Sequence, residues 1–140
     1  TVIGIDTNVL LRWLIAPDEW DIGSSKNEID IVDKTLRAKG AEFFVNPIVV
    51  AETTWILEQK LKLDRAAVCE VIDRLLYSTN IRVGEANAVN DARQVYGHSN
   101  VGFADCLIAR INRRAGCAYT LTFDRKAGRQ AGFRNIQATD

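Results

Sequence analysis

Four acidic residues have the types and surroundings best suited to chemistry, namely Asp6, Glu52, Asp105 and Asp124. Asp6 directly follows the apolar run Val-Ile-Gly-Ile, and Asp124 follows Thr-Leu-Thr-Phe. Glu52 and Asp105 lie among apolar residues, with no basic partner nearby in the sequence. Acids in such neighbourhoods are rarely buried unless they are paired or bound to a metal. We therefore consider all four as ligands of one metal site.

A divalent cation would explain why several carboxylates gather. Carboxylates that lie close together repel and raise one another's pKa, and a cation removes that penalty. Oxygen ligands alone suit Mg²⁺ or Mn²⁺. Such an ion lowers the pKa of a bound water and stabilises charge on a phosphoryl oxygen. The four acids therefore predict hydrolysis of phosphodiester bonds.

Each acid also has a simpler explanation when it is considered alone. Asp6 or Asp124 could cap the helix that follows it. Asp105 could favour a helix N-terminus through the helix dipole, and Glu52 could face solvent. A phosphatase with Asp6 as nucleophile is a further alternative, but that chemistry usually needs a second aspartate two residues later, where this chain has Asn8.

The elements that would position these acids alternate between strands and helices, a pattern typical of a parallel α/β sheet. Strands are predicted at 2–6, 42–46, 81–83 and 119–123, with a weak edge strand near Ile136; the first is predicted to be buried. Helices are predicted at 9–15, 28–38, 47–61, 65–77, 85–96, 103–115 and 125–130. Ligands bind beyond the carboxyl ends of parallel strands, so the acids are expected near one edge of the sheet.

The length of 140 residues suits a single domain spanning 1–140. The segment Ala16–Asn27 is predicted to be a loop, in which Trp20 either packs on the domain or stacks on a base. The chain has no apolar run of 18 residues and no signal-peptide pattern at its start, so we expect a cytoplasmic protein. The three cysteines, at 69, 106 and 117, lack zinc-ligand spacing and are expected to be reduced core residues.

The charges are unevenly distributed. Lys and Arg total 18 and Asp and Glu total 18, so the net charge is zero and general binding of polyanions is not expected. Residues 100–140 contain seven basic and three acidic side chains, which gives +4 there and −4 in the first 99 residues. Arg125, Lys126 and Arg129 are therefore candidates for contacts with RNA phosphates.

Four motifs together resemble a known family. They are Asp-Thr-Asn-Val-Leu-Leu-Arg from Asp6, Glu52 with Trp55 on an apolar helix, Phe-Ala-Asp ending at Asp105, and Thr-Phe-Asp-Arg around Asp124. Their order resembles the PIN-domain family, and in particular the VapC-type ribonuclease toxins of toxin–antitoxin pairs. The likeness extends from Val2 to about Ile136.

This resemblance implies a three-layer α/β/α sandwich with a central, mainly parallel sheet of four to five strands. It implies that the four acids bind Mg²⁺ or Mn²⁺ and cut RNA, with Thr7, Asn8 and Thr122 as supporting residues. It also implies a homodimer and a cognate antitoxin. Many relatives carry another aspartate where this chain has Gly102, which puts a second metal in doubt. A catalytically silent PIN-like module that binds RNA or protein is the alternative.

Overall fold

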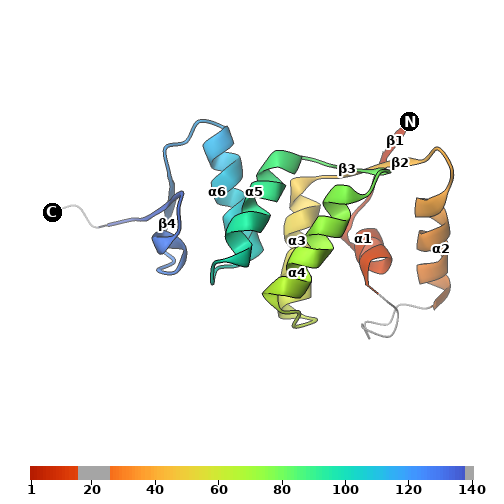
Figure 1. Cartoon of the computed structure of the whole chain (residues 1–140), viewed down its shortest axis with the longest axis horizontal. Coiled ribbons are helices and arrows are strands. Elements are labelled where there is room, and N and C mark those ends of the chain that lie inside the picture. Colours follow the sequence, from red (N-terminus) through yellow and green to blue (C-terminus); the bar gives the residue numbers. More distant parts are fainter. Residues whose placement is uncertain (16–25, 138–140) are drawn as a thin grey trace. The chain divides into compact units, whose positions relative to one another are not determined.

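The structure, a computed structural model, describes residues 1–15 and 26–137. It divides into two compact units, Thr1–Gly84 and Glu85–Asp140, and each unit has its own sheet and helices. Figure 1 traces the order of the elements along the chain. Within the described ranges, no helix is both long enough and apolar enough to cross a lipid bilayer.

The first unit contains a parallel sheet with the strand order β1-β2-β3. Its strands are β1 (Val2–Gly4), β2 (Glu42–Val45) and β3 (Ile81–Val83). In the register, Ile3 lies opposite Phe43 and Phe43 opposite Ile81. All strands therefore point the same way, as the alternation of strands and helices predicted.

Four helices connect and cover these strands. They are α1 (Thr7–Leu14), α2 (Lys26–Arg37), α3 (Pro47–Gln59) and α4 (Arg65–Tyr77). Helix α1 packs on both α2 and α3, and α4 packs on α3 and β3. The centre of the unit consists of fully buried side chains from these elements: Leu10, Leu11, Phe43, Val45, Leu57, Val68 and Ile72.

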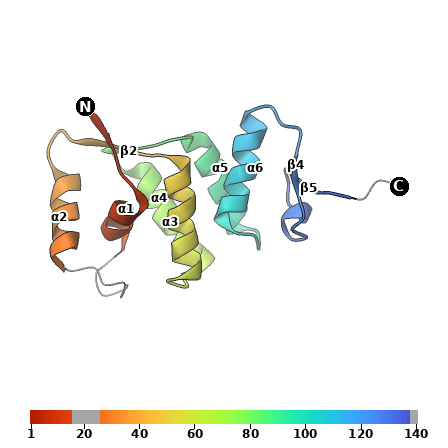
Figure 2. The ribbon, with the colours of Figure 1, turned by 180° about the vertical axis from the view of Figure 1, so that it is seen from behind.

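The second unit pairs two helices with a small parallel sheet. Its helices α5 (Ala86–Gly97) and α6 (Phe103–Arg114) lie side by side in Figures 1 and 2. Strands β4 (Thr120–Thr122) and β5 (Phe133–Asn135) pair in parallel, and a short 3-10 helix, η1 (Ala127–Arg129), connects them. In the core, the rings of Tyr96 and Phe103 meet edge to face, with centroids 5.7 Å apart.

The predicted elements agree with the structure closely, with a few differences at their ends. Helix α2 starts at Lys26, so the predicted loop Ala16–Asn27 is two residues too long. The rest of that loop, Trp20 included, lies outside the described residues. The predicted 125–130 helix is the short η1, and the weak strand near Ile136 is β5, which ends one residue earlier.

Two burial predictions were wrong. Strand β1 was predicted to be buried, but Val2 and Ile3 are 40% and 49% exposed. An apolar run shows that a segment can be buried, whereas actual burial requires elements that cover it, and among the described residues β1 pairs with β2 on one edge. Cys69 and Cys106 are buried as predicted, but Cys117 is exposed in the turn after α6.

Candidate functional site

Asp6 is held at the start of helix α1. Its backbone is extended, and its Oδ1 accepts a hydrogen bond from the Val9 N–H at 3.1 Å, so it is the N-cap of α1. The side chain is exposed. A cap of this kind occupies one carboxylate oxygen and leaves the second for another ligand. The capping role considered from the sequence is therefore correct, and it is compatible with metal binding.

The two residues after Asp6 differ in their surroundings. Thr7 is buried in the first unit, whereas Asn8 is exposed and lines a shallow groove with Val9 and Arg12. Arg12 donates to the Asn8 carbonyl at 2.9 Å and forms an ion pair with Glu28 of α2, also at 2.9 Å. These contacts fix the first turn of α1, and with it the backbone around Asp6.

Glu52 lies on the exposed side of α3. The helix begins at Asn46, whose side chain accepts from the Val49 N–H at 3.0 Å, and Pro47 occupies its first turn. Glu52 borders a shallow groove of about 350 Å³ with Ala51, Trp55 and Ile56. The apolar neighbours seen in the sequence therefore surround an exposed carboxylate, as in the alternative in which Glu52 faces solvent.

Asp105 and Asp124 influence one another electrostatically. Asp105 lies in the first turn of α6 and is half-buried. Burial raises the pKa of its carboxyl above the usual value of 3.8, and the negative charge of Asp124 raises it further. These two acids are separated by much of α6 and all of β4 in sequence, yet the second unit places them close enough for their charges to interact.

The loop that carries Asp124 is fixed at several backbone atoms. The Asp124 N–H donates to Thr122 Oγ1 at 3.0 Å, and its Oδ1 accepts from the Ala127 N–H at 3.0 Å. Its carbonyl accepts from the Gly128 N–H at 2.9 Å and from Asn135 Nδ2 at 2.9 Å. Asp124 thus accepts a hydrogen bond from the first residue of η1, although the N-cap position is occupied by Lys126 and the Asp124 side chain is exposed.

The four predicted acids are distributed two and two over the units. Asp6 and Glu52 lie on α1 and α3, which pack against each other in the first unit. Asp105 and Asp124 lie together in the second unit. Over residues 1–15 and 26–137, no three or more His, Cys, Asp or Glu side chains form a group that could hold a metal ion.

The donor chemistry of the second unit fits a divalent cation. Asp105 and Asp124 supply carboxylate oxygens, the ligands that Mg²⁺ and Mn²⁺ prefer. The pKa of Asp105 is raised by burial and, to a smaller extent, by the negative charge of Asp124, and a cation bound to both carboxylates would relieve both effects. Arg125, Lys126 and Arg129 are exposed in the same loop and in η1, so their charges are accessible to an anionic substrate.

Sequence reasoning missed Asn135 and Gly128. Asn135 contacts the Asp124 loop only because β5 pairs in register with β4, with Asn135 opposite Thr122. The sequence indicated a weak strand in this region without its partner, so no local signal pointed to the contact. Gly128 lies against the same Asn135 side chain, and its role depends equally on that pairing.

Comparison with known proteins finds similarity over nearly the whole chain. A model of the PIN domain family matches residues 3–132. A protein of Aquifex aeolicus (strain VF5) named VapC ribonuclease is 26% identical over 132 residues, which cover 94% of this chain and 93% of that protein. The matched residues include parts of both units.

Proposed function

Because this chain belongs to the PIN-domain family, we propose that it is a metal-dependent endoribonuclease with Asp6, Glu52, Asp105 and Asp124 as its catalytic carboxylates. Membership of the family also gives the chain the PIN α/β fold, as predicted. The ribonuclease name of the Aquifex relative supports the activity. The observation that carries the proposal is the position of Asp105 near Asp124, because burial and the charge of Asp124 raise the pKa of the Asp105 carboxyl, and a cation would relieve both effects.

The proposed cofactor is Mg²⁺ or Mn²⁺, which would activate a water and stabilise negative charge on a phosphoryl oxygen. The carboxylate oxygens of Asp6 and Asp124 that accept no backbone hydrogen bond are proposed as ligands, together with Asp105 and Glu52. Thr7 and Asn8 would support the backbone at Asp6, and Thr122 does so at Asp124 through its hydroxyl.

The proposed substrate is RNA, and its phosphates would be met by Arg125, Lys126 and Arg129, which are exposed beside Asp124. Charged side chains of this kind orient a nucleic acid without reading its sequence. We further propose that residues 1–140 act as a single PIN domain, because the family match extends from Ile3 to Gly132.

A toxin role in a toxin–antitoxin pair is a further proposal, as are a homodimer and an antitoxin partner. They rest on the resemblance of the four motifs to the VapC-type toxins, and the printed name of the relative adds the ribonuclease activity alone. Expression of the chain in a bacterial host is expected to arrest growth. Co-expression of the product of the neighbouring gene should restore growth. Growth that is unaffected by the chain would contradict the toxin role, while leaving the nuclease activity to be measured directly.

The nuclease proposal is tested with Asp6→Asn and a matched control, Asp64→Asn. Asp64 caps α4 as Asp6 caps α1, since its Oδ1 accepts from the Ala67 N–H at 2.8 Å. Asparagine caps helices about as well as aspartate, so both variants should fold. We expect cleavage of single-stranded RNA in Mn²⁺ to be lost in Asp6→Asn and retained in Asp64→Asn. Equal cleavage by both would overturn the assignment of Asp6.

Calorimetric titration of the wild-type protein with Mn²⁺ separates the nuclease from the silent alternative. A metal-dependent enzyme should bind Mn²⁺, and Asp6→Asn should bind it more weakly. Binding of RNA with no binding of Mn²⁺ and no cleavage would instead favour a catalytically silent PIN-like module.

A further inference from the structure

The loop that carries Asp124 is held by a side chain from the neighbouring strand, and this contact suggests a role for Asn135. Resting on the proposed function, we propose that Asn135 is a positioning residue that fixes the Asp124 carboxylate for metal binding, and that Gly128 is required to make room for it. The inference concerns residues of the second unit alone.

The Asn135 amide connects two points of the backbone. Its Nδ2 donates to the Asp124 carbonyl at 2.9 Å and lies 3.4 Å from the Thr122 carbonyl. Thr122 is the last residue of β4, and Asp124 follows two residues later. A single amide therefore links the end of the strand to the acid, and it fixes the turn between them.

Residues of η1 also form hydrogen bonds to the turn that carries Asp124. The Gly128 N–H donates to the Asp124 carbonyl, and the Ala127 N–H donates to Asp124 Oδ1. Ala127 is 1% exposed, so η1 is anchored in the unit by a buried residue. The backbone of Asp124 is thus fixed by strand β5 and by η1, and its carboxylate is oriented by a bond to the main chain.

Glycine is needed at position 128 because there is no space for a side chain there. A Cβ atom added at this position would lie less than 3.0 Å from Oδ1, Cγ and Nδ2 of Asn135. Such distances are not tolerated, so either the amide or η1 would have to move. A larger residue at 128 is therefore expected to displace the Asn135 side chain from the Asp124 carbonyl, even though Asn135 itself is unchanged.

The contact is relevant to metal binding because it fixes the backbone of Asp124, the residue whose carboxylate lies near Asp105. Replacing a residue that orients a metal ligand, without binding the metal itself, typically lowers metal affinity about 10–100-fold. Asn135 lies beyond the residues that the family model matches, which end at 132, so the family match does not assign it a role.

The test compares Asn135→Ala and Gly128→Ala with a control, Asn112→Ala. Asn112 also uses its Nδ2 to hold β4, since it donates to Thr120 Oγ1 at 3.0 Å, but it does so at the start of the strand. We measure Mn²⁺ affinity by calorimetry and the hydrogen exchange of the backbone amides by NMR. The Ala127 and Gly128 amides report the loop, and amides of the β4–β5 ladder report folding.

We expect Mn²⁺ affinity to fall about 10–100-fold in Asn135→Ala and Gly128→Ala, and by less than about 3-fold in Asn112→Ala. Exchange at Ala127 and Gly128 should become faster in the first two variants, while the ladder amides of all three stay protected. In the double variant that combines Asn135→Ala with Gly128→Ala, the methyl group added at position 128 has room. The Mn²⁺ affinity of this double variant should therefore be no lower than that of Asn135→Ala alone.

The possible failures are distinguishable. Wild-type protein that binds no Mn²⁺ would overturn the proposed function and this inference together. Wild-type binding that is matched by both variants would overturn the inference alone. Unchanged exchange at Ala127 and Gly128 in Asn135→Ala would also overturn it, because the loop would then not depend on the amide. If the amides of the β4–β5 ladder lose protection from exchange in Asn135→Ala but not in Gly128→Ala, then Gly128→Ala decides the question. Its Mn²⁺ affinity and its exchange at Ala127 and Gly128 are judged in the same way.

Discussion

At the scale of single residues, the raised pKa of Asp105 couples folding to pH. The folded protein holds this proton more tightly than the unfolded chain, because burial and the charge of Asp124 disfavour the carboxylate. The contribution of Asp105 to stability is therefore most favourable below about pH 3.8 and becomes less favourable as pH rises through its folded pKa. Ionised Asp105 destabilises the metal-free fold at neutral pH.

The direction of this pH dependence is tested with Asp105→Asn, whose side chain cannot ionise. In metal-free buffer, the wild type should lose stability relative to the variant as pH rises from about 3.5 to 7. Denaturant titrations at several pH values measure this difference, and the same series on Asp64→Asn serves as a control. A wild type that gains stability relative to Asp105→Asn over that range would contradict the raised pKa.

A second prediction at this scale concerns two adjacent threonines on α3. Thr53 and Thr54 are both 2% exposed, and Thr54 Oγ1 donates to the Ala51 carbonyl at 3.0 Å. Thr53 Oγ1 is buried with no hydrogen-bond partner among the described residues. Thr53→Val should stabilise the protein by about 1 kcal/mol, whereas Thr54→Val should destabilise it by about 1 kcal/mol. Urea unfolding distinguishes the two, and equal effects would show that the Thr53 hydroxyl is satisfied.

The sequence allowed the local hydrogen bonds of individual acids to be predicted, but not their exposure or their distant contacts. The helix cap at Asp6 and the hydrogen bond from Ala127 to Asp124 each depend on the next three residues, so such local bonds could be considered from the sequence alone. The exposure of Glu52 and Cys117 depends on which elements pack nearby, and no local pattern contains that information. Asn135 was missed because its contact with Asp124 exists only through the pairing of β5 with β4.

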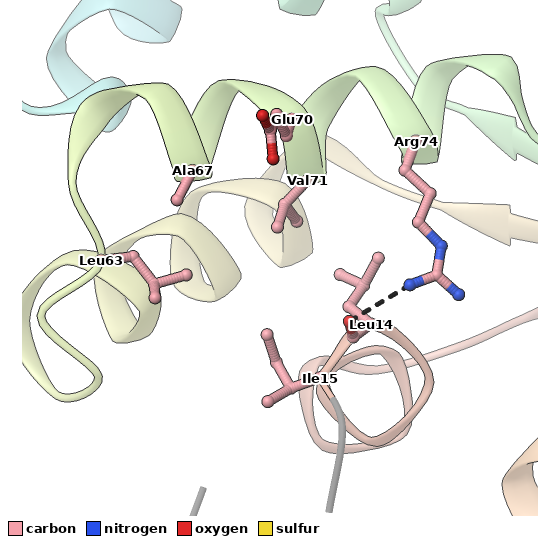
Figure 3. A pocket seen from close by; sticks show the side chains of 7 residues that line it. All are labelled: Leu14, Ile15, Leu63, Ala67, Glu70, Val71 and Arg74. Atoms are coloured by element: carbon pink, nitrogen blue, oxygen red, sulfur yellow. Dashed lines mark hydrogen bonds between the residues drawn. The ribbon is translucent and has the colours of Figure 1, made fainter. Parts of the chain in front are cut away.

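At the scale of the elements, Arg74 on α4 completes the end of α1 (Figure 3). Its guanidinium donates to the Leu14 carbonyl at 3.2 Å and to the Trp13 carbonyl at 3.4 Å, and it lies 4.5 Å from the centre of the Trp13 ring. The last carbonyls of a helix have no hydrogen-bond partners within the helix, and a cation at that end also interacts favourably with the helix dipole. A groove of about 540 Å³ lies beside this contact, lined by Leu63 and Val71 among others.

Arg74→Met keeps the aliphatic stem and removes these donors, so it should lower the free energy of unfolding by about 1–2 kcal/mol. Arg74→Lys should recover only part of the loss, because an ammonium cannot reach two carbonyls and stack as a planar group does. Arg82→Met is the control, since Arg82 stacks on Phe44 at 5.4 Å but caps no helix. An Arg74→Met protein as stable as the wild type would show that α1 ends without this help.

Element boundaries were predictable where the signal is local. The apolar spacing of α4 predicted Arg65–Tyr77, and the structure has that helix. Helix α2 was predicted two residues late, because no capping residue was identified in the loop before it. The sequence did not show that β4 pairs with β5, since strand partners are set by contacts distant in sequence.

At the scale of the whole molecule, the charge distribution determines how salt should affect RNA binding. The net charge is zero, so a strong salt dependence must arise from a local basic cluster. Replacing Arg125, Lys126 and Arg129 together by glutamine should weaken binding of single-stranded RNA. It should also reduce the slope of log K against log salt by about 0.7 for each phosphate that the variant no longer neutralises.

A matched variant replaces Lys34, Lys39 and Lys62, three exposed lysines of the first unit, by glutamine. This change removes the same charge, and it should leave the slope nearly unchanged. Fluorescence anisotropy from about 50 to 200 mM salt measures both slopes. An equal reduction in the two variants would mean that total charge, and not the cluster beside Asp124, governs binding.

The global prediction from the sequence succeeded for the fold class and the family, because four short motifs in order constrain both. The assembly of the metal site was not decided by the sequence and stays a prediction. Motif order identifies ligands of the right kind, whereas coordination depends on atomic positions that the motifs do not contain.

The exposed position of Cys117 gives the protein a natural attachment point for a probe. The other two sulfur atoms are buried, so a maleimide dye should react with one thiol per folded chain. That thiol lies in the turn just ahead of β4, the strand that leads to Asp124. A fluorophore placed there would report, without any engineered cysteine, when a nucleotide chain or a protein partner arrives.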